Sequence, residues 1–238
     1  MRAPRMKSIG KVVLFGSALF IVLFFAANTV WTLHGTDEWK LEIDRDGVQV
    51  YSYKESGSYN KIFKSVMNTD FTPSQIVGSL VMDNNSLDNC KEWIPECKEL
   101  KVIEPYSDKM QGDVVLWTLE LMPGLFKNRE YLIKTHANEK SDTKVVTIDV
   151  MAGGNKIPLN NKTVRITHIH NRWQMTPLDN GRIELQLIQD FSMGGFFPNF
   201  LLNLVGAREA HKLFAEQLPK LVDKERYRNA RFDYISQR

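Results

Sequence analysis

The sequence predicts an α+β domain in which a curved antiparallel sheet of about nine strands wraps around one long C-terminal helix. The first observation is a series of short runs with alternating apolar residues, joined by turn residues, which is typical of consecutive antiparallel strands. The second is the segment from Phe197 to Leu221, where apolar residues recur at spacings of three and four. A sheet of this length must twist, so we expect helices to cover its concave side.

Turn and capping residues mark the first elements. The segment Asp44–Gly47 separates two strand-like runs and indicates a hairpin. Thr72 and Gln75 form a capping-box pattern, which indicates the start of a helix. Strands are expected at 40–43, 48–53, 59–68, 97–104, 110–121, 130–137 and 144–151.

The last two strands precede the long helix. The segment Asp179–Gly181 supplies a turn between strands expected at 165–175 and 182–192, which should pair as a long hairpin. Gly194 and Gly195 then permit backbone angles that other residues resist. The periodicity that follows favours an ordinary core helix covering the sheet, and a lid hinged at the two glycines is the alternative.

The N-terminus resembles a targeting segment. Four basic residues precede an apolar run from residue 12 to residue 27, which indicates an export signal or a membrane anchor. Cutting after Ala27 or Thr29 would not leave small residues both three and one positions before the cut. We therefore predict an uncleaved anchor, with a cleaved signal peptide as the alternative, and a domain on the non-cytoplasmic side.

We divide the chain into a targeting segment over 1–35, a single domain over 36–225 and a basic C-terminal tail over 226–238. The formal net charge is +3, and the four basic residues at the N-terminus account for more than all of it. Nucleic acid is therefore not an expected partner. The tail is expected to be a solvated helix end, and the sequence does not indicate an oligomeric state.

Only two cysteines occur, Cys90 and Cys97, and Pro95 between them prevents one regular helix from containing both. In an exported domain a disulfide is favoured over free thiols, and closing so short a loop is worth about 2–3 kcal/mol. Two buried thiols are the alternative. No zinc site is expected, because no second Cys or His pair stands at ligand spacing.

Several motifs follow one another in a particular order and spacing. They are Trp39, Asp46–Tyr51, Cys90–Cys97, Asn128–Tyr131, Trp173–Pro177, Gly181, Asp190, Gly194–Gly195 and Pro198. This order resembles the START domain, the StAR-related lipid-transfer family, and especially its bacterial branch. The resemblance implies a helix-grip fold whose sheet and helix enclose a tunnel for one lipid. The sequence departs from it at Glu130, the acid of the family's Arg-Asp motif, and at Thr135, where sterol carriers have an arginine, so a sterol is not implied.

The resemblance also implies a set of lipid-binding residues, with Gly194 and Gly195 as the hinge of a gate. The set is Trp117, Arg129, Trp173, Phe196, Phe197, Phe200, Leu201 and Leu204. Each member has a structural alternative. Arg129 is expected either to bond to Glu130, Asp190 or a loop carbonyl or to contact a lipid head group. The tryptophans are tunnel lining or core, and the residues that open the helix are a gate or a hydrophobic cap.

We therefore expect a lipid-binding or lipid-transfer protein that is not an enzyme, with a lipid of unknown type and the membrane as partners. It would face the periplasm from a bacterial inner membrane, or be secreted there if the signal is cleaved. A helix-grip cyclase or hydrolase and a lipid-sensing module are the alternatives. The sequence has no nucleophile elbow, Walker loop or dinucleotide fingerprint, and no cofactor is expected. His168 and His170 share one side of a strand, but a third ligand is not evident, so no metal is expected.

Overall fold

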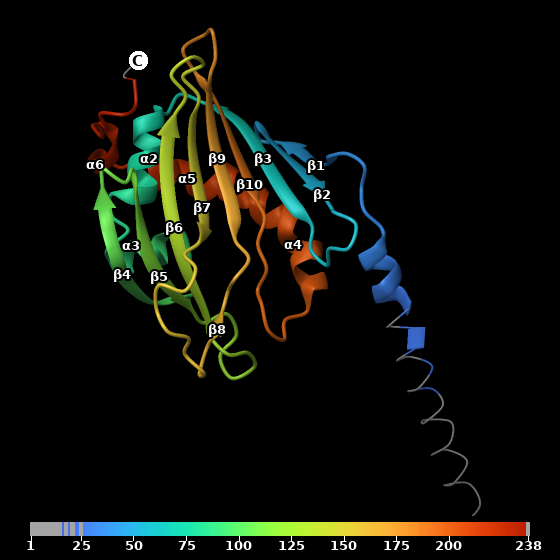
Figure 1. Cartoon of the computed structure of the whole chain (residues 1–238). Coiled ribbons are helices and arrows are strands. Elements are labelled where there is room, and N and C mark those ends of the chain that lie inside the picture. Colours follow the sequence, from blue (N-terminus) through green and yellow to red (C-terminus); the bar gives the residue numbers. More distant parts are fainter. Residues whose placement is uncertain (1–15, 17–18, 20–21, 24–25, 237–238) are drawn as a thin grey trace, which may run out of the picture.

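Figure 1 shows the computed structural model of the chain, which describes residue 16, residue 19, residues 22–23 and residues 26–236. Its sheet has ten strands in the order β1-β2-β3-β10-β9-β7-β6-β5-β4, with β8 added beside β6. Neighbours in that order are antiparallel, whereas β8 pairs with β6 in parallel. The strands are β1 (Lys40–Arg45), β2 (Val48–Tyr53), β3 (Ile62–Thr69), β4 (Cys97–Ser107), β5 (Gly112–Leu119), β6 (Arg129–Glu139), β7 (Val146–Ala152), β8 (Val164–Arg165), β9 (His170–Pro177) and β10 (Ile183–Gln189).

Helices pack against one face of this sheet (Figure 1). The first part of the long C-terminal helix contacts β1, β2 and β3, and further along it Phe214 stacks on Trp173 of β9. The main core lies between this helix and the sheet, and it includes Phe214 and Leu218 of the helix and Val50, Ile148 and Leu185 of the strands. The predicted fold class is therefore confirmed. The helical segments are α2 (Pro73–Val81), α3 (Leu87–Trp93), α4 (Asn199–Lys212), a π-helical turn η1 (Leu213–Gln217), α5 (Leu218–Val222) and α6 (Glu225–Arg228).

The first helix begins as its sequence indicates, and the next one was not predicted. The Thr72 hydroxyl accepts from the Gln75 backbone N–H and the Gln75 side chain reaches back to Thr72, which completes the capping box. Helix α3 is capped by Ser86, whose hydroxyl accepts from the backbone N–H of Asn89. This helix is too short for its apolar period to stand out from its polar neighbours.

The predicted long hairpin was wrong in its first strand. β9 starts at His170, and Val164–Arg165 forms β8 beside β6. Burial explains the difference, because Ile166 is buried in a second apolar cluster and Arg165 forms an ion pair of 2.8 Å with Glu130 on β6. These contacts hold residues 164–166 beside β6, whereas Ile169 still forms a bridge with Phe191, just after β10.

The C-terminal helix is interrupted near its middle. A π-helical turn separates α4 from α5 just before Pro219, which has no backbone N–H to give to the preceding turn. His211, Phe214, Leu218 and Leu221 are buried on its inner face as the periodicity predicted.

The prediction of a solvated tail was wrong. Tyr227, Ala230, Phe232 and Ile235 are buried, and the last three belong to the main core. The prediction rested on the basic residues of the tail. These residues alternate with the buried apolar ones and form ion pairs, such as Arg226 with Asp83 at 2.6 Å. Residues 226–236 therefore pack against the domain.

In the described residues, no helix is long and apolar enough to cross a membrane. The anchor predicted over residues 12–27 lies largely outside the described residues. Residues 26–33 are described and helical, and they lead towards β1 (Figure 1).

Candidate functional site

The segment between β10 and α4 begins with two glycines in a left-handed conformation. Gly194 has a φ of 57° and Gly195 a φ of 53°, a region that disfavours residues with a Cβ atom. A Cβ at either glycine would also come within 3.3 Å of Val164 on β8. The sequence thus places glycine where both the backbone angles and the space require it.

Arg129 fastens this segment to the start of β6. Its side chain is buried, and it donates from Nε to the Met193 carbonyl at 3.3 Å, from Nη1 to the Lys127 carbonyl at 2.5 Å and from Nη2 to the Phe196 carbonyl at 3.2 Å. Its guanidinium also lies 5.3 Å from the ring centre of Phe126 and 5.5 Å from that of Phe197.

Among the partners considered for Arg129 from sequence, the structure selects loop carbonyls. Glu130 is engaged by Arg165. Burial of a guanidinium without a carboxylate lowers the pKa of Arg129, although arginine stays protonated in proteins. We call this set of contacts, from Arg129 to the segment 193–197, the latch.

Some of the residues predicted as a gate pack against the protein, and the others are exposed to solvent. Phe197 packs on Phe126 with ring centres 5.4 Å apart, and Leu201 is half-buried. By contrast, Phe196, Phe200 and Leu204 expose 90%, 62% and 75% of their surface. Phe200 and Leu204 are four residues apart and lie on one side of α4, whereas Phe196 lies in the loop just before the helix, and we call these three residues the outer stripe.

The exposure of Leu204 corrects the predicted inner face of the helix. A Cβ at Gly206 would lie 2.2 Å from the Phe63 ring, so the absent side chain allows α4 to approach β3 closely. The line of contact therefore runs through Gly206 and Ala210, and Leu204 turns outward.

One loop joins the outer stripe to the N-terminal segment. The Tyr59 carbonyl accepts from the Trp31 indole at 3.0 Å and from the Asn203 amide on α4 at 2.9 Å. The Asn203 side chain in turn accepts from the Lys61 backbone N–H at 2.8 Å. Asn203 was missed in the sequence because a lone asparagine on a helix carries no signal of its partner.

A cleft of about 380 Å³ opens beside the latch. At its wall His168 Nε2 lies 2.6 Å from Asp190 Oδ1, and polar and apolar atoms line the cleft in about equal measure. His170 is 3.8 Å from Asp149 instead, so the two histidines have separate carboxylate partners. No group that could hold a metal ion occurs among the residues that the structure describes. The lining residues are Gly57, Ser58, Tyr59, Asn60, His168, Asp190, Ser192, Gly194, Gly195 and Asn199.

The two tryptophans predicted as tunnel lining lie in different surroundings. Trp173 is buried and stacks on Phe214 with ring centres 5.9 Å apart and an interplanar angle of 7°. Trp117 is half-buried, and its indole N–H donates to Asn84 Oδ1 at 3.1 Å. Asn84 also contacts Asp113, and neither was singled out from sequence, although an acid next to Val114 in an apolar strand was the available signal.

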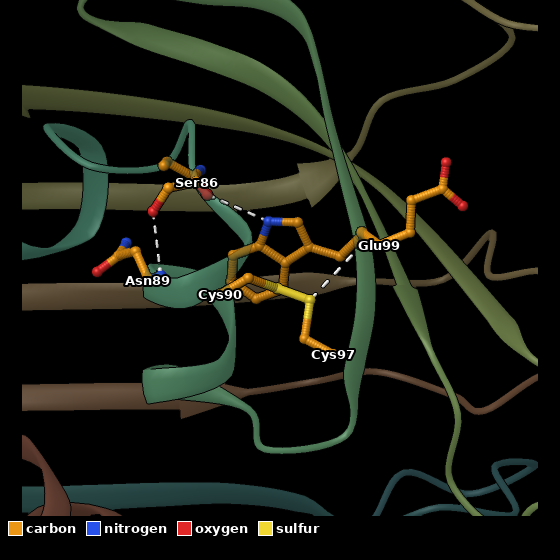
Figure 2. Close-up of a disulfide and its surroundings, with 7 residues drawn as sticks. Ser86, Asn89, Cys90, Cys97 and Glu99 are labelled. Carbon is orange, nitrogen blue, oxygen red and sulfur yellow. Dashed lines mark hydrogen bonds between the residues drawn. A yellow bond between two sulfur atoms is a disulfide. The ribbon is translucent and has the colours of Figure 1, made fainter.

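The predicted disulfide is confirmed. Cys90 on α3 and Cys97 at the start of β4 are bonded, with their Cα atoms 6.0 Å apart (Figure 2). Both belong to the second apolar cluster, together with Val115 and Ile166. The bond therefore holds α3 against the sheet.

A curved antiparallel sheet gripping a long C-terminal helix, with a glycine loop leading into that helix, defines a helix-grip protein. The chain belongs to the polyketide cyclase/dehydrase and lipid transport family, whose pattern matches residues 85–216. The resemblance inferred from sequence is therefore confirmed at the level of family and fold, and this fold supports a lipid-binding function.

Similar proteins agree with this assignment. An uncharacterized protein of Pseudomonas aeruginosa is 26% identical over 169 residues, which are 70% of this chain and 78% of that protein. A STAR-related lipid transfer protein from Xanthomonas axonopodis is 22% identical with a TM-score of 0.63, covering 78% of this chain and 97% of its own. Human StAR-related lipid transfer protein 5 is 15% identical with a TM-score of 0.60, covering 87% and 97%. The two structural likenesses establish the fold.

Proposed function

We propose that this protein is a non-catalytic lipid-binding or lipid-transfer protein that holds one lipid in an internal tunnel and is tethered to a membrane by its N-terminal segment. The observation that carries the proposal is the outer stripe of Phe196, Phe200 and Leu204, three large apolar side chains that are exposed in the loop before α4 and in its first two turns. Aligned apolar exposure of this kind marks an interaction surface rather than ordinary solvent-facing helix.

A lipid surface is the partner that fits this stripe. The described end of the N-terminal segment is bonded through Trp31 to the same Tyr59 carbonyl that holds Asn203 on α4. An apolar segment inserted in a bilayer would therefore bring the outer stripe to the same bilayer. Amphipathic faces with Phe and Leu enter the boundary between head groups and acyl chains in this way.

The energetics of lipid extraction require a gate. Moving an acyl chain from a bilayer into water costs about 0.8 kcal/mol for each methylene, so a carrier needs an enclosed apolar interior that opens at the membrane. The start of α4 has the parts for such a gate: the hinge glycines, the latch at Arg129 and the close contact at Gly206 on which the helix can turn.

The periplasmic side of a bacterial inner membrane is the proposed location. The disulfide between Cys90 and Cys97 supports it, because disulfides persist in oxidising compartments. Cell fractionation tests the tether: quantitative release of the chain from membranes without detergent would rule the anchor out.

The decisive experiment is mass spectrometry of lipid that co-purifies with the full chain. We expect one lipid molecule per folded chain, and a folded sample without lipid would overturn the proposal. Replacing Gly194 and Gly195 by valine tests the hinge, since it should slow lipid exchange more than it lowers lipid capacity. Equal loss of both would mean that the glycines only support folding.

One observation favours a second function, that of an enzyme acting on an apolar substrate. His168 and Asp190 form a hydrogen-bonded pair at the wall of the cleft beside the latch, which is the arrangement of a general base and the group that orients it. Hydrolysis of a long-chain ester by the full chain, lost in His168→Gln, would support this function. Equal rates for the two proteins would exclude a role for the pair.

A further inference from the structure

The helical segment over residues 26–33, which we call the N-terminal helix, ends against the loop that joins β2 to β3. The last carbonyls of a helix have no partner within it and need donors from elsewhere. The Thr32 carbonyl accepts from the Gly57 backbone N–H at 2.7 Å. The Leu33 carbonyl accepts from the Ser56 hydroxyl at 3.2 Å. The loop therefore supplies donors that the end of the helix lacks.

Lys54 lies at the centre of this contact, and only 3% of its surface is exposed. Its ammonium donates to the His34 carbonyl at 2.5 Å and to the Thr32 carbonyl at 3.4 Å. A third bond, to the Glu55 carbonyl at 3.3 Å, uses the remaining donor. The ammonium also lies 5.1 Å from the ring centre of Trp31. A cation at this end of a helix interacts favourably with the helix dipole.

The burial of this ammonium makes the contact specific. Taking an ammonium out of water is costly, and burial lowers the pKa of Lys54. Two of the three carbonyls that satisfy it belong to Thr32 and His34, at the end of the N-terminal helix. Undocking of the helix would therefore leave both the ammonium and the helix carbonyls without these partners. The arrangement favours one position of the helix over the others.

The chain continues this contact after the helix. The Thr36 backbone N–H donates to the Lys54 carbonyl at 2.8 Å, and the Lys54 backbone N–H donates back to the Thr36 hydroxyl at 2.9 Å. A Cβ at Gly35 would lie 2.8 Å from the backbone nitrogen of Ser56, so only glycine allows the two segments to approach this closely. The docking therefore depends on a close backbone fit as well as on the Lys54 ammonium.

We call the contact between residues 31–36 and residues 54–59 the socket, and its far end reaches α4. The Tyr59 carbonyl accepts both from the Trp31 indole and from the Asn203 side chain. Asn203 lies in the part of α4 that carries the outer stripe. One loop therefore holds the N-terminal helix and the first turns of α4 together.

We propose that the socket fixes the direction of the N-terminal helix relative to the domain, with Lys54 as its positioning residue, and that this direction holds the outer stripe at the bilayer. The role at the bilayer rests on the proposed function, whereas the fixed direction does not require lipid binding. Without the socket, residues 34–39 would act as a flexible linker. Six such residues span about 13 Å on average, which would leave the helix free to reorient.

The direction of the helix can be measured as a distance between two spin labels on the full chain in detergent. Ala27 on the helix and Lys134 on β6 are exposed, and the two native cysteines are bonded to each other, so Ala27→Cys and Lys134→Cys provide the free thiols. We expect a narrow distance distribution from double electron–electron resonance. Lys54→Met should broaden it by on the order of 10 Å. A broad distribution with Lys54 in place would overturn the proposal.

Two further variants separate a positioning role from a structural one. Gly35→Val keeps Lys54 but obstructs the backbone approach, and it should broaden the distribution as well. The matched control is Lys64→Met, because the Lys64 ammonium lies over the rings of Trp39 and Tyr51, at 4.6 and 4.7 Å from their centres. This control should leave the distribution narrow. Equal broadening by Lys54→Met and Lys64→Met, or a lower melting temperature of Lys54→Met with a narrow distribution, would mean that Lys54 only supports the fold.

Phospholipid nanodiscs distinguish this proposal from the proposed function. With the full chain inserted in them, hydrogen exchange at residues 196–204 should be slower than in detergent, and Lys54→Met should remove that protection. Equal protection in both proteins would overturn the role of the socket at the bilayer. Exchange that is equally fast in nanodiscs and in detergent would contradict the proposed membrane contact itself, and the spin-label distances would still decide whether the socket fixes the helix.

Discussion

Replacing Arg129 by glutamine is the sharpest test of the latch. The change removes donors to the carbonyls of Met193, Lys127 and Phe196 and the guanidinium between two phenylalanine rings. Three hydrogen bonds from a charged donor and two cation–π contacts together are worth roughly 5–7 kcal/mol. Relief from burying an unpaired charge returns several kcal/mol of this, so we expect a net loss of about 3 kcal/mol in the free energy of unfolding.

The loss should also be local. Hydrogen exchange should rise in residues 193–201 before the sheet unfolds, because the latch holds that segment and not the core. Urea denaturation followed by circular dichroism measures the global free energy, and mass-resolved hydrogen exchange measures the local one. Arg129→Lys should be intermediate, since one ammonium cannot match the fork of three guanidinium donors.

Arg172→Gln is the matched control for this test. Arg172 is also on a strand and forms an ion pair with Asp149, but about half of its side chain is exposed. Its loss should cost less than about 1 kcal/mol. If Arg129→Gln also cost less than about 1 kcal/mol in the free energy of unfolding and left hydrogen exchange at 193–201 unchanged, the latch would not stabilise this segment.

Three further predictions follow from the structure. Replacing Cys90 and Cys97 by serine should lower the free energy of unfolding by about 2–3 kcal/mol, measured in urea, since the closed loop is short. In a chain that begins at residue 28, after the predicted anchor, Phe200→Ser should weaken binding to phospholipid vesicles in a flotation assay and leave the melting temperature unchanged, because the side chain is 62% exposed. The raised pKa of Asp113 means that the folded state holds its proton more tightly than the unfolded state, whose pKa is about 3.9. Stability should therefore fall as the pH rises through the folded pKa, and Asp113→Asn should lack that fall.

Controls for these predictions lie elsewhere on the chain. Leu41→Ser on β1 removes a residue that is 47% exposed and outside the outer stripe, so vesicle binding should persist. Equal loss of flotation in both variants would contradict a role for the stripe. Wild-type protein under reducing conditions should unfold at the same urea concentration as the double serine variant, and a difference would point to an effect of the substitutions themselves.

Local signals predicted most of the fold. The capping box at Thr72 is contained within four consecutive residues and was identified correctly. The strand expected from Arg165 failed because its partner is Glu130, thirty-five residues away in the sequence. Burial of the tail was not predicted for the same reason, since Tyr227 donates to Asp83, which is 144 residues away in the sequence. Pairings that distant leave no trace in periodicity.

The candidate site was predictable only where a residue type is itself the signal. Gly194 and Gly195 were recognised because positive φ needs glycine, and they have it. The partners of Arg129 could be narrowed to carboxylates or carbonyls but not chosen, because the choice depends on which loop lies above β6. Asp113 was not identified from the sequence, because it is unusual only in being buried, and burial cannot be read from the residue type.

The arrangement of α4 implies that opening of its first turns can be separated from unfolding. Beyond Gly206 the helix is held by Phe214 and Leu218 in the main core, whereas before it the contacts are the latch, Asn203 and half-buried Leu201. Breaking the latter group would also expose Phe197 and Leu201, whereas the outer stripe is already exposed. Polar and apolar contacts therefore both oppose opening, and a membrane that receives the stripe would offset part of their free energy. The start of α4 is therefore expected to open at a lower free energy than the rest of the domain, while the sheet and α5 remain folded.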